Sequence, residues 1–179
     1  MYQKLDITID TTALKNALEK TDLWDKYPFR RLRNSPHKEM VDIYVRFMNL
    51  QPYLRTGDSS LLGKPHKSIW YESEIATLVK PIAKKIMDHV NGKQLGGILI
   101  TKLPPNKQIY PHRDYGWHAE YYDKYYVCIK DGGSRFIFED GEINPTENDV
   151  WKFNNQQTHS VVNANKERFA MIVCIKGKG

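Results

Sequence analysis

Three short motifs pair a histidine with a carboxylate two residues further on, and each could hold part of a metal site. They are His37-Lys-Glu39, His112-Arg-Asp114 and His118-Ala-Glu120. In a strand, residues two apart point to the same face, so such a pair can offer two ligands to one cation. With six histidines and 21 acidic residues, one such pair is expected by chance. Context favours His112 and Asp114, which directly follow an apolar run typical of a strand.

This pair also has a partner further along the chain. His159 opens another short apolar run, and two histidines with one carboxylate form the facial triad that binds non-haem Fe(II) and leaves positions open for O₂. Nine residues later comes Arg168, which we expect deeper in the fold than the metal. A guanidinium there can grip a carboxylate through two hydrogen bonds. Iron beside such an arginine predicts a pocket for a short dicarboxylate that chelates metal, namely 2-oxoglutarate.

The segments around these residues predict short strands. From Gly96 onward, β-branched and aromatic runs alternate with turn residues, as in a sandwich or barrel. The expected strands are residues 98–102, 108–112, 124–130, 135–139, 149–153, 159–163 and 168–175. Pairing of the last two through a turn at 164–167 would place Arg168 beyond the metal.

The first half predicts helices with one strand between them. Apolar spacing predicts a helix over 10–24 and another over 73–90, and Pro81 is expected to kink or split the second one. Residues 40–50 alternate as a strand does, whereas 51–67 have the Gly, Pro and Ser content of a long surface loop. The expected fold is mainly β, of the α+β class, with helices on one side of an antiparallel core.

Residues 96–175 resemble the catalytic domain of the aspartyl/asparaginyl β-hydroxylases, Fe(II)- and 2-oxoglutarate-dependent oxygenases with a double-stranded β-helix (jelly-roll, cupin-like) fold. The matching segments are 101–116, 124–129, 149–155, 159–163 and Arg168, with a looser match over 36–46. The resemblance implies that His112, Asp114 and His159 bind iron and that Arg168 pairs with the distal carboxylate of 2-oxoglutarate. It also implies hydroxylation of an amino acid or a peptide side chain of Asp, Asn or Pro type, with O₂ consumed and succinate formed.

The cosubstrate pocket departs from the family at two positions. Lys124 and Tyr126 stand where relatives carry Arg and His, and Thr101 stands where a hydroxyl completes the pocket. A lysine offers a point charge rather than a planar fork, so its contact with the cosubstrate differs from that of an arginine. We expect one domain over 1–179, with helical support and substrate-side elements in 1–95 and the oxygenase core in 96–179.

Several residues are candidates for the substrate side. His37 and Arg46 are expected to meet a substrate carboxylate, and Tyr115 and Trp117 are expected to wall the pocket. The cluster Arg30, Arg31 and Arg33 is either a solvated loop or an anchor for an anionic substrate.

The charge of the chain keeps a second class of substrate open. Lys and Arg number 27 against 21 Asp and Glu, giving +6, with a pI of about 9.2. This excess is spread along the chain rather than gathered in an arm. A nucleic-acid base is therefore an alternative substrate, ranked below an amino acid or peptide. A non-enzymatic metal-binding β-barrel is a third interpretation, against which the intact spacing of the triad and Arg168 argues.

Composition also bears on location. The longest apolar run covers residues 169–175, far short of the roughly 20 residues of a membrane-spanning helix. The first ten residues lack the basic flank and apolar stretch of a secretory signal, so we expect a cytoplasmic protein. Cys128 and Cys174 lie in apolar runs and are expected to be buried, reduced thiols. The sequence carries no signal for an oligomeric state.

Overall fold

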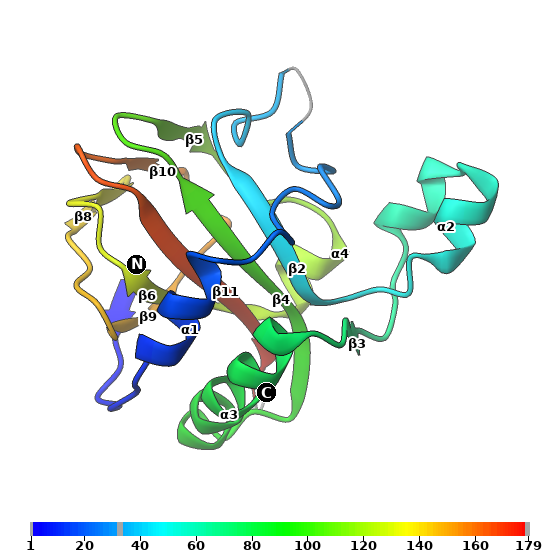
Figure 1. Cartoon of the computed structure of the whole chain (residues 1–179), viewed down its shortest axis with the longest axis horizontal. Coiled ribbons are helices and arrows are strands. Elements are labelled where there is room, and N and C mark those ends of the chain that lie inside the picture. The colour runs from blue at the N-terminus through cyan, green and yellow to red at the C-terminus, as the bar shows by residue number, and fades with distance from the viewer. Residues whose placement is uncertain (1, 32–33, 178–179) are drawn as a thin grey trace.

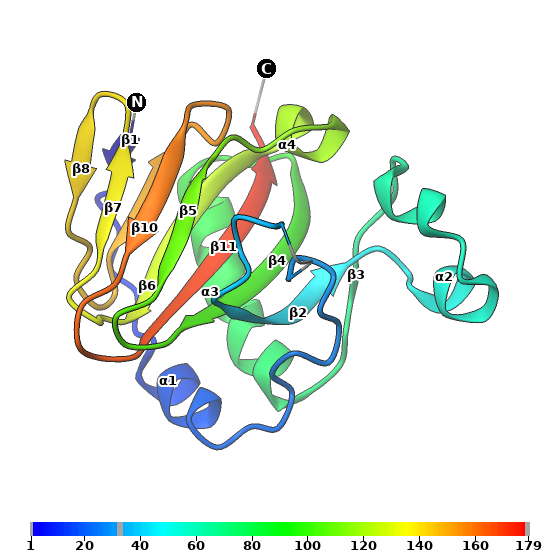
Figure 2. The ribbon, with the colours of Figure 1, turned by 90° about the horizontal axis from the view of Figure 1, so that it is seen from above.

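The computed structural model describes residues 2–31 and 34–177, and two antiparallel sheets face each other within them (Figure 2). The larger sheet has the strand order β1-β9-β6-β11-β4-β2-β3, and the smaller one β5-β10-β7-β8. The larger contains β1 (Tyr2–Lys4), β2 (Val41–Phe47), β3 (Ile69–Trp70), β4 (Gln94–Leu103), β6 (Asp123–Lys130), β9 (Val150–Phe153) and β11 (Arg168–Lys176). The smaller contains β5 (Gln108–His112), β7 (Arg135–Phe138), β8 (Gly141–Ile143) and β10 (His159–Val162).

Helices α1 (Thr12–Leu18) and α3 (Glu74–His89) cover the outer face of the larger sheet (Figure 1). Ser73 caps α3, because its side-chain oxygen accepts a hydrogen bond from the Ala76 N–H at 3.1 Å. Pro81 lies inside α3 and is exposed, and the helix continues past it, so the predicted split is wrong, whereas the alternative of a kink stays a prediction. Packing of the buried stripe that includes Ile75, Val79 and Ile86 outweighs the local cost of the proline.

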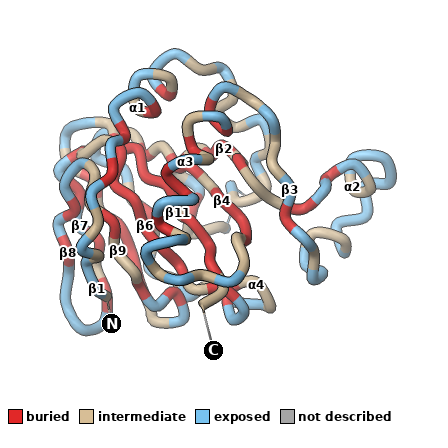
Figure 3. The backbone as a smooth tube through the Cα atoms, turned by 90° about the horizontal axis from the view of Figure 1, so that it is seen from below, coloured by how far each residue is buried: buried red, intermediate tan, exposed pale blue. Residues whose placement is uncertain are grey.

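Alternation along the strands divides the interior into two layers. Central strands such as β6 and β11 are covered on both faces and are buried along most of their length (Figure 3). On β6, Tyr125, Val127 and Ile129 pack toward the helices, together with residues of β2, β4 and β11. Tyr126 and Cys128 point the other way and pack with residues of the smaller sheet. The inner layer therefore lies between the two sheets, and it holds the cavity described below.

The seven strands expected after Gly96 are confirmed, as is the strand expected over 40–50. The expected pairing of 159–163 with 168–175 is wrong, because β10 and β11 lie in different sheets. The loop expected over 51–67 is wrong, because α2 (Gln51–Thr56) and a 3₁₀ helix, η1 (Ser59–Gly63), occupy it. The proline and glycine that suggested a loop lie instead at the two ends of a helix. Pro52 lies in the first turn of α2, and Gly57 caps its end with a φ of 68°.

Some elements are shorter than expected or were not predicted. The first helix is α1, within the expected 10–24, while β1, β3, β8 and the short helix α4 (Trp117–Tyr121) had no prediction. Strands β1, β2 and β3 join the larger sheet from the first half of the chain. The division at residue 95 stays a prediction. Within 2–31 and 34–177, no helix combines the length and apolar character needed to cross a bilayer.

Candidate metal centre

Strands β5 and β10 bring the predicted metal ligands together. His112 ends β5 and His159 begins β10, and the two residues stand opposite each other in the ladder. Asp114 follows two residues after β5. One ligand atom from each of the three side chains lies within 4.8 Å of the others. The structure therefore assembles the triad that the sequence predicts.

A β-bulge in β5 turns His112 toward the other ligands. The register pairs Ile109 with Val161 and His112 with His159, so β5 has one residue more than β10 between the two pairs. Ile109 and His112 both line one cavity although they are three apart, which strict alternation would forbid. Pro111 suits a bulge because it has no N–H to donate to the ladder.

Hydrogen bonds fix the orientation of both histidine rings. The Nδ1 of His112 lies 2.8 Å from the Tyr110 carbonyl oxygen, and the Nδ1 of His159 lies 2.9 Å from that of Gln157. Each Nδ1–H donates to its carbonyl, which leaves both Nε2 lone pairs to bind a cation. Burial lowers the pKa of His112, and the nearby His159 lowers it further. Both effects favour the neutral ring that a metal needs.

Asn155 holds the third ligand through two contacts. The backbone N–H of Asp114 donates to the Asn155 carbonyl at 2.9 Å. The Asn155 side-chain amide donates to Asp114 Oδ2 at 3.1 Å, and its distance to the Ala119 carbonyl is 3.4 Å. Asn155 is buried. The sequence did not single it out, because an asparagine in a loop carries no sign of a contact 41 residues away.

The triad opens into a cavity of about 310 Å³ between the two sheets, which Arg168, Tyr126 and Thr101 also line. Arg168 is only 2% exposed. Its Nε donates to the Tyr126 hydroxyl at 3.3 Å, while its Nη1 is buried without a hydrogen-bond partner among residues 2–31 and 34–177. A buried guanidinium nitrogen without a partner is costly, so this end of the cavity suits an anion.

The donor set fits the metal and cosubstrate predicted from the sequence. Two imidazole nitrogens and one carboxylate oxygen make a cation site with open positions. The unpaired Nη1 of Arg168 supplies the cationic end that a dicarboxylate needs.

The structure brings some of the other candidates to this cavity and leaves others outside it. Lys124, His37 and Arg46 line it, and the ring of His37 packs 4.5 Å from that of His112 between centroids. Tyr115 and Trp117 are not among the lining residues. The expectation that they wall the pocket is therefore not met, because Tyr115 is 83% exposed in the loop before α4. Trp117 instead packs against His66 and His118.

The arginine cluster divides in the same way. Arg30 lines the cavity and lies 3.5 Å from the buried Asp42. Arg31 pairs with Asp25 and is not a lining residue. Arg33 lies outside the described residues.

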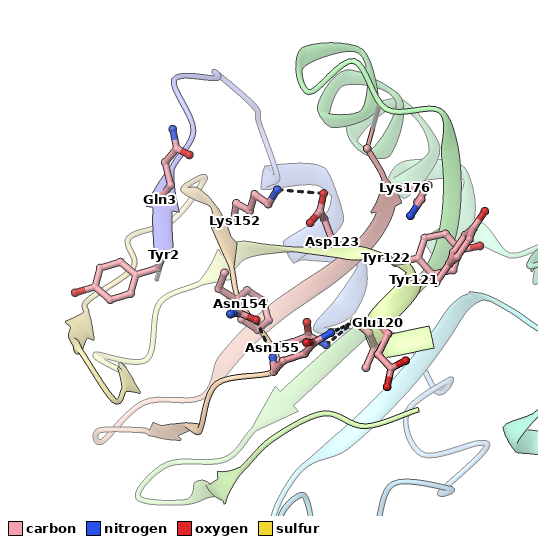
Figure 4. Close-up of a pocket in the computed structure, with 14 residues that line it drawn as sticks. Tyr2, Gln3, Glu120, Tyr121, Tyr122, Asp123, Lys152, Asn154, Asn155 and Lys176 are labelled. Atoms are coloured by element: carbon pink, nitrogen blue, oxygen red, sulfur yellow. Dashed lines mark hydrogen bonds and ion pairs between the residues drawn. The ribbon is translucent and has the colours of Figure 1, made fainter. Parts of the chain in front are cut away.

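A second cavity, of about 480 Å³, opens beside β9 and the start of β6. Lys152 and Asp123 face each other in it as an ion pair of 3.1 Å (Figure 4). Asn155 lines this cavity as well, so one side chain touches both the second cavity and the metal ligand Asp114.

No family model and no curated protein matches this sequence, but solved structures match its fold. A Trichoplax adhaerens prolyl hydroxylase, in complex with a hypoxia inducible factor oxygen degradation domain peptide fragment, is 8% identical at a TM-score of 0.62, with 98% of this chain and 83% of that one covered. A Pseudomonas putida prolyl-4-hydroxylase is 12% identical at 0.60, with 99% and 92% covered. A 2OG-Fe(II) oxygenase family oxidoreductase from Burkholderia pseudomallei is 9% identical at 0.56, with 76% and 66% covered, so the chain spans just under two thirds of its length.

The fold is a double-stranded β-helix, which confirms the prediction of a mainly β, jelly-roll core. At these identities the likeness establishes the fold alone. The similar structures are prolyl hydroxylases and a member of the wider 2OG-Fe(II) oxygenase family. The narrower resemblance to aspartyl/asparaginyl β-hydroxylases stays a prediction.

Proposed function

We propose that this protein is an Fe(II)- and 2-oxoglutarate-dependent dioxygenase that hydroxylates an amino acid or a peptide side chain. One observation carries the proposal. A His-Asp-His cluster and a buried arginine with an unpaired nitrogen line the same cavity. The first can hold iron and the second can hold the far end of a dicarboxylate.

The roles of the residues follow from their geometry. The Nε2 atoms of His112 and His159 and the carboxylate of Asp114 would hold Fe(II) on one side, with the rings kept in place by their carbonyl partners. Arg168 and the Tyr126 hydroxyl would bind the distal carboxylate of 2-oxoglutarate. Thr101, buried on β4 opposite Ala170, would add a hydroxyl to the same pocket.

The overall reaction balances without a further reductant. A substrate C–H bond, O₂ and 2-oxoglutarate give a C–OH group, succinate and CO₂. Bound iron supplies the centre at which O₂ is reduced and the C–H bond is oxidised. The protein binds the reactants, orients them and keeps the site dry, with apolar lining from Ile98, Phe136 and Val161.

The similar structures support the choice of substrate class. The Trichoplax prolyl hydroxylase is in complex with a peptide, and an amino-acid side chain is small enough for a cavity of about 310 Å³. We propose an Asp, Asn or Pro-like residue, free or within a peptide, and the aspartyl/asparaginyl β-hydroxylases as the nearest family.

The test is succinate formation from 2-oxoglutarate with Fe(II), with free amino acids and short peptides supplied as substrates. We expect iron-dependent turnover that His112→Ala and His159→Ala abolish. Arg168→Met should raise the KM for 2-oxoglutarate at least tenfold, since a charged hydrogen bond contributes roughly 1.5–3 kcal/mol. His89→Ala, which changes an exposed histidine at the end of α3, should behave as wild type. Turnover that His112→Ala leaves unchanged, or no iron-dependent succinate with any substrate, would contradict the proposal.

A further inference from the structure

The cavity contains more positive charge than the proposed cosubstrate neutralises. Lys124, Arg46 and Arg168 line it, and none of them forms an ion pair with a carboxylate among residues 2–31 and 34–177. Among the described residues that line it, Asp114 is the one carboxylate, and it belongs to the metal triad. Arg30 also lines the cavity but pairs with the buried Asp42 at 3.5 Å. Two cations without such a pair, Lys124 and Arg46, are thus left over once Arg168 is assigned to 2-oxoglutarate.

Lys124 and Arg168 enter the cavity from strand positions that lie far apart on the larger sheet. Lys124 on β6 pairs in register with Cys174 on β11, six residues from Arg168. At about 3.3 Å per residue, these six residues span roughly 20 Å of strand. The two cations therefore serve different parts of the cavity.

The metal triad is connected to both of these positions. From His159, strand β10 runs toward Asn163, whose amide donates to the Leu103 carbonyl, and Leu103 pairs with Arg168. On the other side, Asn155 connects Asp114 to the carbonyl of Ala119, next to His118. A cosubstrate that extends from the metal to Arg168 leaves the Lys124 end to another molecule.

Lys124 has only weak partners of its own. It is 5% exposed, and its Nζ lies 3.0 Å from His118 Nδ1 and 3.1 Å from the Cys174 sulfur. A thiol sulfur is a weak acceptor, and an ammonium has three protons to donate. Burial lowers the pKa of His118 to about 3, and Lys124 contributes to this, so the ring is neutral. The ring therefore supplies no negative charge to balance the Lys124 ammonium. A buried ammonium without a counter-ion is costly unless a ligand supplies one.

The backbone of Arg46 lies close to His118. A Cβ placed on Gly97 would lie 3.2 Å from His118 Nε2 and 3.5 Å from the Arg46 carbonyl oxygen, so both residues border the Gly97 backbone. The Arg46 guanidinium lies over the Trp70 ring and 3.4 Å from the Leu95 carbonyl, and within the described part of the chain its Nε is buried without a hydrogen-bond partner. A cation with an unpaired buried donor suits an anionic ligand.

We propose that Lys124 and Arg46 form a subsite for a carboxylate of the substrate, with His118 positioning the lysine. This inference rests on the proposed function and assigns Lys124 to the substrate rather than to 2-oxoglutarate. Charge balance supports the assignment. Fe(II), Asp114 and Arg168 together carry two positive charges, which the two carboxylates of 2-oxoglutarate neutralise. The charges of Lys124 and Arg46 remain for the substrate.

The test measures binding by calorimetry to protein loaded with Mn(II) and 2-oxoglutarate, in which no turnover takes place. The probes are the standard L-amino acids taken singly, their α-amides, and Asp and Glu blocked at both backbone ends. A free α-carboxylate and an acidic side chain are the two sources of the group, and the blocked probes distinguish them. We expect at least one carboxylate probe to bind, and its amide to bind at least tenfold more weakly.

Variants assign the binding to the subsite. Lys124→Met should weaken binding of the carboxylate probe by about tenfold to a hundredfold. The affinity of this variant for 2-oxoglutarate should stay within twofold of wild type. Lys124→Arg should recover part of the loss. Lys85→Met, on the exposed side of α3, should bind as wild type. If Lys124→Met does not fold, Arg46→Met gives the same comparison from a less buried position.

The outcomes separate this inference from the proposed function. Wild-type protein that binds neither Mn(II) nor 2-oxoglutarate overturns both. Protein that binds both but no carboxylate probe, or binds acids and amides equally, overturns the subsite alone. A loss of 2-oxoglutarate affinity in Lys124→Met, with probe binding unchanged, assigns Lys124 to the cosubstrate and also overturns it.

Discussion

Asn155 shows how much of a metal site depends on a residue that is not a ligand. It holds the backbone of Asp114 with its carbonyl and the carboxylate with its amide, at 2.9 Å and 3.1 Å. A carboxylate on a loop beyond the end of a strand is otherwise free to rotate. Outer contacts of this kind fix the ligand before the metal arrives.

Asn155→Ala is expected to weaken Mn(II) binding about tenfold to a hundredfold, which is the usual effect of removing such a partner. Metal titration followed by calorimetry or by paramagnetic resonance measures it. Asn154→Ala is the matched control, because the Asn154 side chain accepts a hydrogen bond from the backbone N–H of Gln156 in its own loop. Equal affinities in the two variants would show that Asp114 needs no support from Asn155.

Because Asp42 is buried, we expect the free energy of unfolding to depend on pH. Burial raises its pKa to about 6, which outweighs the attraction of Arg30. In the unfolded chain an aspartate titrates near pH 4. Between these values the folded state binds more protons, so this group makes the protein less stable as pH rises from about 4 to about 6.

Asp42→Asn cannot ionise and should therefore be more stable than wild type at pH 7, by on the order of 2 kcal/mol. At pH 4 the two proteins should unfold alike. Urea unfolding at both pH values measures the difference, with the exposed Asp22→Asn as control. Loss of stability at pH 7 would mean that the Arg30 pair contributes more than burial costs.

Among the structural elements, two turns meet at the Arg168 end of the cavity. The Asn163 amide donates to the carbonyls of Leu103, Pro104 and Lys166, and so joins the end of β4 to the turn before β11. Gly132, after β6, fits against this junction. A Cβ on it would lie 2.8 Å from the Lys166 carbonyl oxygen and 3.0 Å from Arg168 Cβ.

Gly132→Ala should therefore shift the turn and Arg168 with it. We expect a loss of about 1–3 kcal/mol in the free energy of unfolding, as for other overpacked sites, and weaker binding of 2-oxoglutarate. Gly63→Ala is the control, since a Cβ there has no atom within 4 Å. If Gly132→Ala is destabilised but binds 2-oxoglutarate with wild-type affinity, the turn does not determine the position of Arg168.

The strands other than β1, β3 and β8 were predictable because each is rich in β-branched or aromatic residues and bounded by turn residues. Helix α2 was not, since Pro52 and Gly57 are turn formers in a loop and capping residues in a short helix. The predicted split of the helix at Pro81 was wrong for a similar reason. Local propensity marks it as a break, whereas the buried face of α3 on the sheet decides the outcome.

For the whole molecule, the cavity combines residues that are far apart in the sequence. His112, Asp114, His159 and Arg168 were predictable because spacing and residue type identify metal and carboxylate ligands. The grouping of Arg46, His118 and Lys124 was not, because it depends on the order of the strands in the larger sheet. A single sequence contains little information on which strands become neighbours.

Binding of metal and cosubstrate should stabilise the whole fold, since both sheets contribute to the site. With Mn(II) and 2-oxoglutarate at 100 times their dissociation constants, each is expected to add about 2.7 kcal/mol to the free energy of unfolding. Thermal unfolding with and without the two ligands measures this, and EDTA should reverse it. His112→Ala should show no shift, and a shift equal to that of wild type would place the metal elsewhere.

The extra residue in β5 makes the direction of a metal ligand depend on strand geometry as well as on residue type. His112 comes three positions after Ile109, so in a strand without the bulge the two side chains would point to opposite faces and His112 would turn away from His159. Every ligand would still be present in the sequence, and the apolar pattern of the strand would be unchanged. A survey of motifs alone would therefore not detect the loss of the bulge.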